Sequence, residues 1–381
     1  MKKIAMIGLV SAAGLASSAF ALSDGDILLT NFNLDAITLI ENPGGSNTIT
    51  HLITFNDIPS GGGGDNPVRL SDIVRGPSGE YYVGDGSFIT GDDNWDTSRI
   101  IRIDGLLSGA PVASNFLTGA GAGALMNPVG MRYDENYGGL FWVQNPFKRL
   151  GPSQVVNDGI YGSTLAAPSA NLFFAENTAQ PRPYYEAGVY MEREPGRDSY
   201  LVTSLNGGAL GGFSDARGST LWRFTPDYGN PNNSTMELVA DFSNPVALDM
   251  LVQVRGIAKG PNPGEYFITN TSDGDGDPDG PYAPDGVYRL LLDGAGDFVS
   301  LDLVTSAVTR PEALIYNPFT NKLVVGSSTN TAGGIFQMNL DGSGVELLLA
   351  DTHARGFAIV PAPGALSLLG FGSLALLRRR R

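Results

Sequence analysis

The stretch "SDGDGDPDGPYAPDG", which begins at Ser272, carries four carboxylates within seven residues. Its centre reproduces the D-x-D-x-D-G opening of an EF-hand calcium loop. In such a loop, alternate carboxylates converge on one hard cation and the glycine permits a sharp turn. The sequence therefore predicts calcium as the cofactor, with five ligands: Asp273, Asp275, Asp277, Asp279 and Asp285.

The match to a calcium loop is incomplete at its far end. Position twelve, where a bidentate glutamate belongs, is Gly286, and Asp285 comes one place early. A solvated acidic turn is therefore a second interpretation of the same residues. The argument for an ion is that four neighbouring carboxylates repel one another unless a cation neutralises them.

A weaker candidate site lies in "GDDNWDTS", where Asp92, Asn94 and Asp96 alternate. Ser98 and Arg99 follow in place of further acidic ligands. Alternating oxygen ligands again suit calcium, and an ordinary turn again competes with that interpretation.

Motifs for other chemistry are missing from the sequence. "GFSDA" around Ser214 is not a G-x-S-x-G nucleophile elbow, and "GGGGD" from Gly61 lacks the Lys-Ser/Thr of a phosphate loop. The chain has no cysteine, which excludes thiol catalysis and disulfides, and only two histidines, which leaves little for a zinc site.

The overall charge limits the class of partner. The formal net charge is −15, and the positive charges of Lys2, Lys3 and the four terminal arginines lie far from the acidic body. The body between the two ends is therefore more acidic than the whole chain. Such a surface repels the phosphate backbone, so we expect no nucleic-acid partner.

A repeated apolar segment indicates the elements that must position these residues. It reads "DILLTN" from Asp26 and returns at intervals of 54 to 66 residues as "EYYVGD", "GLFWVQ", "SYLVTS", "EYFITN" and "KLVVGS". One run precedes and two runs follow most copies, with turn residues between them. Four short strands repeated six times predict an all-β, six-bladed β-propeller of four-stranded blades over residues 22–360.

The order of the runs at the two ends predicts how the ring closes. The repeat region begins with a second strand at Asp26 and finishes with an unpaired first strand at residues 354–360. We expect this last strand to complete the first blade, because a closed ring leaves no open edge there. The long loops then gather on one face, where we expect binding, and both termini leave from the opposite face.

The N-terminal segment has the order of features found in a secretory signal peptide. Lys2 and Lys3 precede an apolar stretch from Ile4 to about Leu15, and Ala19 and Ala21 flank Phe20 in the small-x-small pattern of a cleavage site. We expect residues 1–21 to be removed after Ala21 and the protein to be exported.

The C-terminal segment, residues 361–381, reads "PAPGALSLLGFGSLALLRRRR". Its apolar part would form a helix of about 20 Å, shorter than the roughly 30 Å hydrocarbon core of a bilayer. The terminal arginines would stay on the cytoplasmic side. A short tail held in this way suits a transient attachment to the inner membrane better than a permanent anchor.

This tail resembles the PEP-CTERM sorting signal of exported bacterial proteins. The resemblance rests on the Pro-x-Pro motif, the apolar stretch and the arginine cluster: Pro361, Ala362, Pro363, Arg378, Arg379, Arg380 and Arg381. It implies a transient partner, an exosortase-type membrane enzyme. Ala362 is a departure, because glutamate is common at the middle position in that family.

Two functions remain open on the sequence. The first is an exported cell-surface or extracellular-matrix propeller that binds a polysaccharide or another surface ligand and touches the membrane only through its tail. The second is a calcium-dependent hydrolase, phytase-like or lactonase-like, with its site on the long-loop face. The lack of catalytic motifs favours the first, although propeller architecture by itself does not fix a function.

Overall fold

The structure is a computed structural model that describes residues 22–32, 34–43, 45–54, 70–86, 98–118, 125, 127–144, 159–175, 188–204, 219–242, 251, 253–271, 283–328 and 333–361. In these ranges the chain forms 24 strands and two 3₁₀ turns, η2 (Leu106–Ser108) and η3 (Pro231–Asn233). Neither turn comes near the length that a membrane-crossing helix needs, and these ranges hold no other helix.

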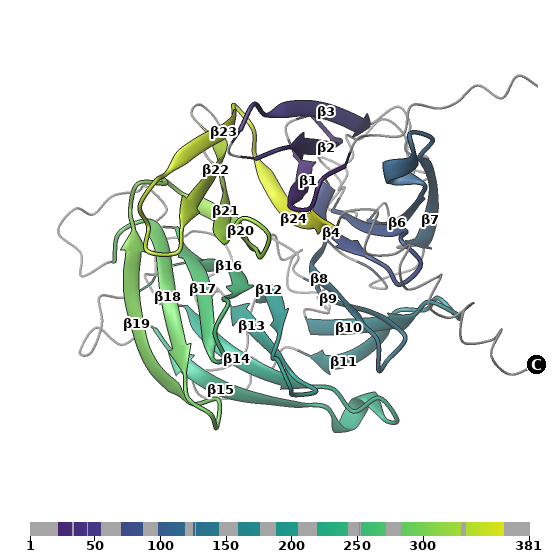
Figure 1. Ribbon diagram of the computed structural model, residues 1–381. Coiled ribbons are helices and arrows are strands. Elements are labelled where there is room, and N and C mark those ends of the chain that lie inside the picture. Colours follow the sequence, from purple (N-terminus) through teal and green to yellow (C-terminus); the bar gives the residue numbers. More distant parts are fainter. Residues whose placement is uncertain are drawn as a thin grey trace, which may run out of the picture.

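The strands form six antiparallel four-stranded sheets, the blades, arranged as a ring (Figure 1). From the axis outward the strands are β24 (Ala354–Val360), β1 (Asp26–Asn31), β2 (Ala36–Glu41) and β3 (Thr48–Ile53) in blade 1; β4 (Leu70–Arg75), β5 (Tyr81–Asp85), β6 (Arg99–Asp104) and β7 (Val112–Thr118) in blade 2; β8 (Pro128–Asp134), β9 (Gly139–Gln144), β10 (Gly159–Thr164) and β11 (Asn171–Ala175) in blade 3; β12 (Gly188–Arg193), β13 (Tyr200–Ser204), β14 (Thr220–Thr225) and β15 (Thr235–Asp241) in blade 4; β16 (Val254–Lys259), β17 (Glu265–Asn270), β18 (Gly286–Leu292) and β19 (Phe298–Thr305) in blade 5; and β20 (Pro311–Asn317), β21 (Lys322–Ser327), β22 (Gly334–Asn339) and β23 (Glu346–Ala350) in blade 6.

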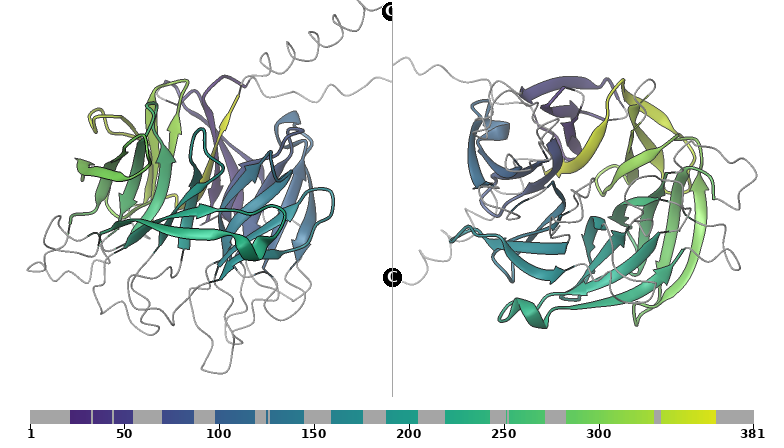
Figure 2. Two further views of the ribbon diagram at one scale, coloured as in Figure 1. Left: turned by 90° about the horizontal axis from the view of Figure 1, so that it is seen from below. Right: turned by 180° about the vertical axis from the view of Figure 1, so that it is seen from behind.

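The predicted fold and its ring closure are confirmed. β24 pairs with β1 in antiparallel register, with Leu28 opposite Ala358 and Asp26 opposite Val360. The backbone N–H of Gly25 also donates to the carbonyl of Val360 at 3.2 Å. The described ends of the chain therefore meet at one face of the disc, the face of the short hairpins that join the first and second strands of each blade (Figure 2).

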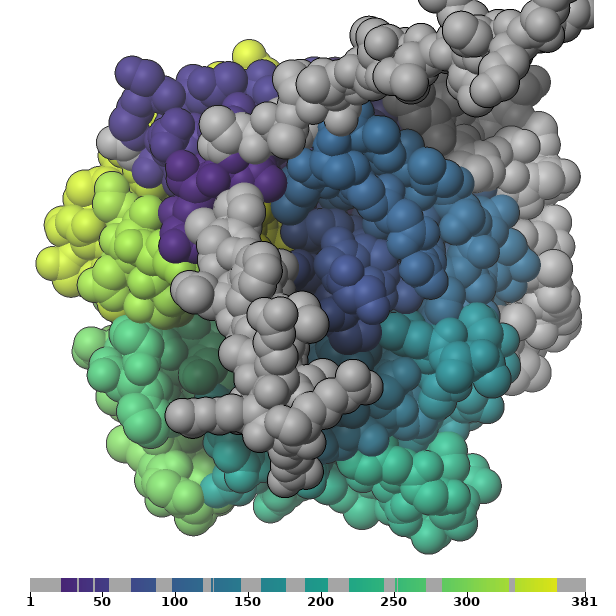
Figure 3. Space-filling view, turned by 45° about the vertical axis from the view of Figure 1, so that its right-hand side comes forward, coloured from purple at the N-terminus to yellow at the C-terminus, as the bar shows by residue number. Residues whose placement is uncertain are grey.

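The apolar core lies between neighbouring blades. The second strands are buried along their whole length in blades 1 to 5, because each blade packs against a neighbour on both faces. This explains why "GLFWVQ" and "EYFITN" are nearly continuous apolar runs. The outermost strands are only half-buried, and β15 and β19 mix exposed and covered residues. Figure 3 shows blades 1 to 3 following one another around the disc in chain order, from purple to teal.

Each innermost strand carries one extra residue relative to its partner strand. The register shifts lie at corresponding places in all six blades, between Leu70 and Ile73, Val129 and Arg132, Gly188 and Met191, Val254 and Ile257, Pro311 and Leu314, and around Arg355. Such a β-bulge bends the strand and re-aims its side chains. Here the bulges lie on the innermost strands, which surround the axis of the ring.

Candidate functional site

Most residues of the predicted calcium and sorting sites lie outside the described residues. This holds for Asp273, Asp275, Asp277 and Asp279, for Asp92, Asn94 and Asp96, for Ala19 and Ala21, and for Ala362, Pro363, Arg378, Arg379, Arg380 and Arg381. Pro361 is described, immediately after β24, and Asp285 is described, immediately before β18. The sites themselves stay predictions.

Asp285 has a structural contact of its own. Its carboxylate accepts a hydrogen bond from the backbone N–H of Arg310 at 2.8 Å. This bond links the entry of β18 to the segment before β20, and so joins blade 5 to blade 6. Among the described residues, no group of three or more histidine, aspartate or glutamate side chains is arranged to hold a metal ion.

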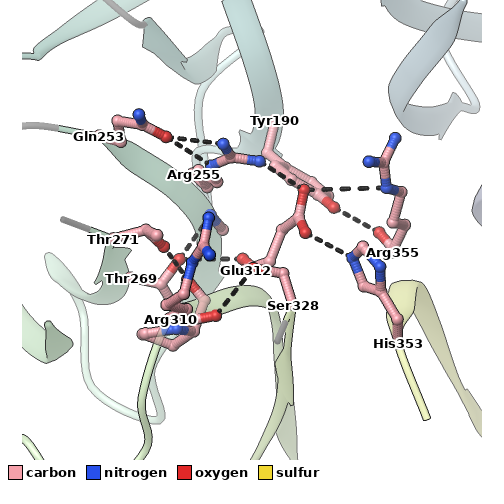
Figure 4. A network of polar contacts seen from close by, with 12 residues as sticks. Tyr190, Gln253, Arg255, Thr269, Thr271, Arg310, Glu312, Ser328, His353 and Arg355 are labelled. Atoms are coloured by element: carbon pink, nitrogen blue, oxygen red, sulfur yellow. Dashed lines mark hydrogen bonds and ion pairs between the residues drawn. The ribbon is translucent and has the colours of Figure 1, made fainter. Parts of the chain in front are cut away.

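The structure brings together a polar cluster in the channel that the sequence did not reveal. Glu312, on the β20 bulge, is 2 % exposed. Its Oε1 accepts from Arg255 Nη1 at 2.7 Å and lies 3.8 Å from Arg355 Nε, while its Oε2 contacts His353 Nε2 at 2.6 Å. Figure 4 shows these three side chains converging on one carboxylate from β16, from β24 and from the residue before β24.

The partners of Glu312 are themselves held in place. Nε and Nη2 of Arg255 donate to Oε1 of Gln253 at 3.1 and 2.6 Å. The guanidinium of Arg355 lies 4.4 Å from the ring centroid of Phe32, a cation–π contact. Second contacts of this kind fix the orientation of each cation, so the cluster is a rigid part of the channel.

Tyr190 closes the channel from the opposite side. It lies on the bulge of β12 in blade 4, and its hydroxyl donates to the backbone carbonyl of Arg355 in blade 1. These two blades face each other across the axis of a six-membered ring. The tyrosine side chain therefore spans the channel, and together with the Glu312 cluster it forms what we call the channel plug: Tyr190, Arg255, Glu312, His353 and Arg355.

In the channel plug, the negative charge of Glu312 is offset by the neighbouring positive charges. Burial raises the pKa of Glu312, but Arg255, Arg355 and the hydrogen bond from His353 outweigh burial and hold this pKa well below its ordinary value. Burial, then the nearby charges of Glu312 and Asp72, raise the pKa of Tyr190 well above its ordinary value. The carboxylate thus stays ionised and already neutralised, and the tyrosine stays a hydrogen-bond donor.

A cavity of about 730 Å³ opens on the other side of the plug, at the short-hairpin end of the channel. Tyr190 and Asp72 lie at its inner end, and the later residues of the inner strands form its wall. The sequence predicted binding on the opposite, long-loop face, whose longest loops lie outside the described residues. The cavity is a second candidate, and its volume is typical of small-molecule sites.

One charged cluster lies in the wall of this cavity. Asp72 accepts from the backbone N–H groups of Ile73 and Met131 at 2.8 and 2.6 Å, and its Oδ2 is 3.6 Å from Arg132 Nη1. Arg132 also donates from Nη2 to Glu192 Oε2 at 3.0 Å. Burial raises the pKa of Asp72 to about 6, against the opposing effects of Arg132 and the two N–H donors.

The signal that could have found these residues was present in the repeat. In five of the six blades, the innermost strand carries a charged or aromatic residue at its second or third position. These residues are Asp72, Tyr190, Arg255, Glu312 and Arg355. Polar residues at that point of a buried strand are costly unless they are paired. Their recurrence at or next to the same position of the first run is a signal for a shared polar environment, although it does not show which of these side chains meet.

The sequence matches no protein-family model and no curated protein. Solved structures do resemble the fold. A chain of a nidogen–laminin complex is 12 % identical with a TM-score of 0.54, and the match covers 88 % of this chain and 97 % of that one. A putative 6-phosphogluconolactonase from Bacteroides fragilis is 12 % identical with a TM-score of 0.53, covering 89 % and 98 %.

A gluconolactonase from Xanthomonas campestris is 13 % identical with a TM-score of 0.50, and the match covers 90 % of this chain and 93 % of that one. The chain shares the propeller fold with these proteins. At such identities the likeness shows the fold alone, because one propeller architecture hosts unrelated functions.

Proposed function

We propose that this protein is an exported propeller that acts at the cell surface or in the extracellular matrix as a binding module. The observation that carries the proposal is the channel plug. The buried carboxylate of Glu312 is neutralised by two arginines and a histidine, and Tyr190 spans the axis. A carboxylate compensated in this way has little charge left to offer a cation.

The second support is the cavity at the short-hairpin end. It is walled by rigid inner strands and combines an apolar lining with one cluster of charged side chains. This composition is typical of a preformed small-molecule site. Delivery would follow from the signal peptide at residues 1–21 and from the PEP-CTERM-like tail at residues 361–381, processed by an exosortase-type enzyme.

The binding function is tested on the mature protein purified from the exporting cell. We expect it to be retained on extracted extracellular matrix and to show no turnover of phosphoester or lactone substrates in the presence of calcium. Calcium-dependent turnover that Asp275→Asn with Asp277→Asn abolishes would establish the hydrolase instead. The same double variant should leave retention on the matrix unchanged.

Export and sorting are tested by the mass of the same material. We expect an N-terminus at Leu22 and a C-terminus near Pro363, because the tail is proposed to be a transient handle. A mass that still includes Arg381 would reject processing. It would leave a membrane-associated tail as the alternative.

A further inference from the structure

The cavity wall is asymmetric around the axis. One residue from each inner strand, at the position just beyond the bulge, contributes to it: Val74, Arg132, Glu192, Ala258, Ile315 and Ala358. Blades 3 and 4 supply the Arg132–Glu192 ion pair, and the other four blades supply apolar side chains. The wall thus offers an apolar arc opposite a single polar pair.

The two acidic side chains of the cavity share one arginine. Asp72 is bonded by two backbone N–H groups and faces Arg132, and Glu192 is paired with the same arginine. The cluster of two carboxylates and one guanidinium keeps one net negative charge, and Arg75 and Lys259 bring the ionisable side chains that line the cavity to a net charge of +1. Glu192 keeps 22 % of its side chain exposed, so it can still accept a hydrogen bond from a ligand hydroxyl.

The cations at the rim are not compensated. Arg75 and Lys259 are the last residues of β4 and β16 and line the cavity. Within the described part of the chain, neither forms an ion pair or a hydrogen bond through its side chain. They lie on blades 2 and 5, which face each other across the axis. In a protein of net charge −15, the unmatched charge of this cavity is positive.

Tyrosines complete the rim. Tyr133 and Tyr316 line the cavity, and the hydroxyl of Tyr316 donates to Oδ1 of Asn321 at 2.9 Å. A tyrosine ring gives an apolar surface on which the C–H face of a sugar ring can pack, while its hydroxyl keeps a polar partner. Combined with an apolar arc and two separated cations, this arrangement fits a hydroxylated ring compound that carries carboxylates.

We propose that the cavity binds an acidic saccharide, with carboxylates at Arg75 and Lys259 and a sugar ring between the apolar arc and the Arg132–Glu192 pair. Two cations on opposite sides of the opening match an oligomer whose carboxylates are spaced along its length. The inference rests on the proposed binding function and adds the ligand class and the face of the disc that binds it.

The test uses the mature protein and galacturonic acid oligomers as the probe, measured by titration calorimetry. We expect Arg75→Gln and Lys259→Gln each to weaken binding about tenfold, the effect of losing one ion pair worth about 1.4 kcal/mol. Lys322→Gln is the matched control, because Lys322 lies on the neighbouring hairpin of blade 6 outside the cavity. Lys322→Gln should bind the oligomers as tightly as the wild type does. Raising the salt concentration should weaken the binding of the oligomers by all three variants.

Two further polymers test which part of the ligand the cavity recognises. Galactose oligomers, which lack the carboxylates, should bind at least tenfold more weakly, and polyglutamate, which lacks the rings, should not compete. Equal binding of the neutral oligomers, equal competition by polyglutamate, or no loss in either cavity variant would overturn the proposal. Matrix retention that survives Lys259→Gln undiminished would also overturn it while leaving the binding function itself intact.

Discussion

At the scale of single residues, the charged side chains of the channel plug depend on one another for stability. Glu312 contacts Arg255 and His353 directly and lies near Arg355, and its whole side chain is buried. Removing one partner of a buried ion pair leaves the other charges desolvated without compensation. We therefore expect the stability of the plug to depend most on the one carboxylate that both arginines and His353 share.

We expect Glu312→Gln to lower the free energy of unfolding by about 3–5 kcal/mol, because it leaves two largely covered guanidinium groups without a counter-charge. Denaturant unfolding followed by fluorescence measures the change. Arg102→Gln is the control, since its pair with Asp104 is about half exposed and should matter little. Equal stability of Glu312→Gln and wild type would mean that the plug is not a structural ion pair.

A second residue-scale prediction concerns Asp72 and pH. Its pKa rises from 3.8 to about 6 in the folded state, where it faces Arg132 on β8 and Glu192 and Tyr190 on β12. The folded protein therefore binds this proton more tightly than the unfolded chain does. Its contribution to stability is complete below pH 4 and is lost as the pH rises through 6, a change of about 3 kcal/mol.

The measurement compares wild type with Asp72→Asn between pH 4 and pH 7. The difference in unfolding free energy should move in favour of the variant as the pH rises, because asparagine cannot ionise. A difference that is constant across this window would contradict the raised pKa. Glu312 is present in both proteins, so its own contribution to the pH dependence cancels in this difference.

At the scale of elements, the bulged inner strands pack backbone against backbone. Gly130 has φ +56°, and a Cβ added there would lie 2.7 Å from Cα of Tyr190 on the next inner strand. A Cβ at Gly356 would lie 2.6 Å from Cα of Asp72. Side chains are thus excluded where neighbouring inner strands come closest, and this close approach lets six bulges surround one narrow channel.

We expect Gly130→Ala to destabilise the protein by roughly 1–3 kcal/mol more than Gly138→Ala. Both glycines have positive φ, so both variants carry the backbone strain of about 1 kcal/mol. Gly138 has open space around it, so only Gly130→Ala also forces two strands apart. Comparing the thermal unfolding of the two variants isolates the steric part of the destabilisation. Equal melting temperatures would contradict the close approach of the strands at Gly130.

At the scale of the whole molecule, the ring depends on a strand that is last in the sequence and first in its blade. β24 covers the inner edge of β1 and carries Arg355 into the channel plug, and His353 lies immediately before it. Without this segment, β1 would present an unpaired edge at the axis, and Glu312 would lose two of its three partners.

We expect truncation after Thr352, which removes His353, β24 and the tail, to abolish cooperative unfolding or to lower the melting temperature far below that of the intact protein. Truncation after Pro363 removes the tail alone and should leave the melting temperature unchanged, because every strand pairing remains. Circular dichroism on heating distinguishes the two. Similar melting of both truncated forms would show that ring closure contributes little to stability.

The sequence by itself determined the number of blades, the order of strands and the closing strand. These features depend on local periodicity: second strands buried on both faces read as continuous apolar runs, and turn residues separate them. The run "EYFITN" and the closing strand predicted at residues 354–360 match β17 and β24 in their bounds, because each lies between clear turn signals.

Only the tertiary structure decided what the channel contains. Arg255, Glu312 and Arg355 are far apart in the sequence, and nothing in their local context shows that bulges in three strands turn them toward one point. Asp72 and Arg132 meet for the same reason, across the boundary between two blades. Strand pattern is a property of neighbours along the chain, whereas the charge balance of a channel is set by residues that only ring closure brings together.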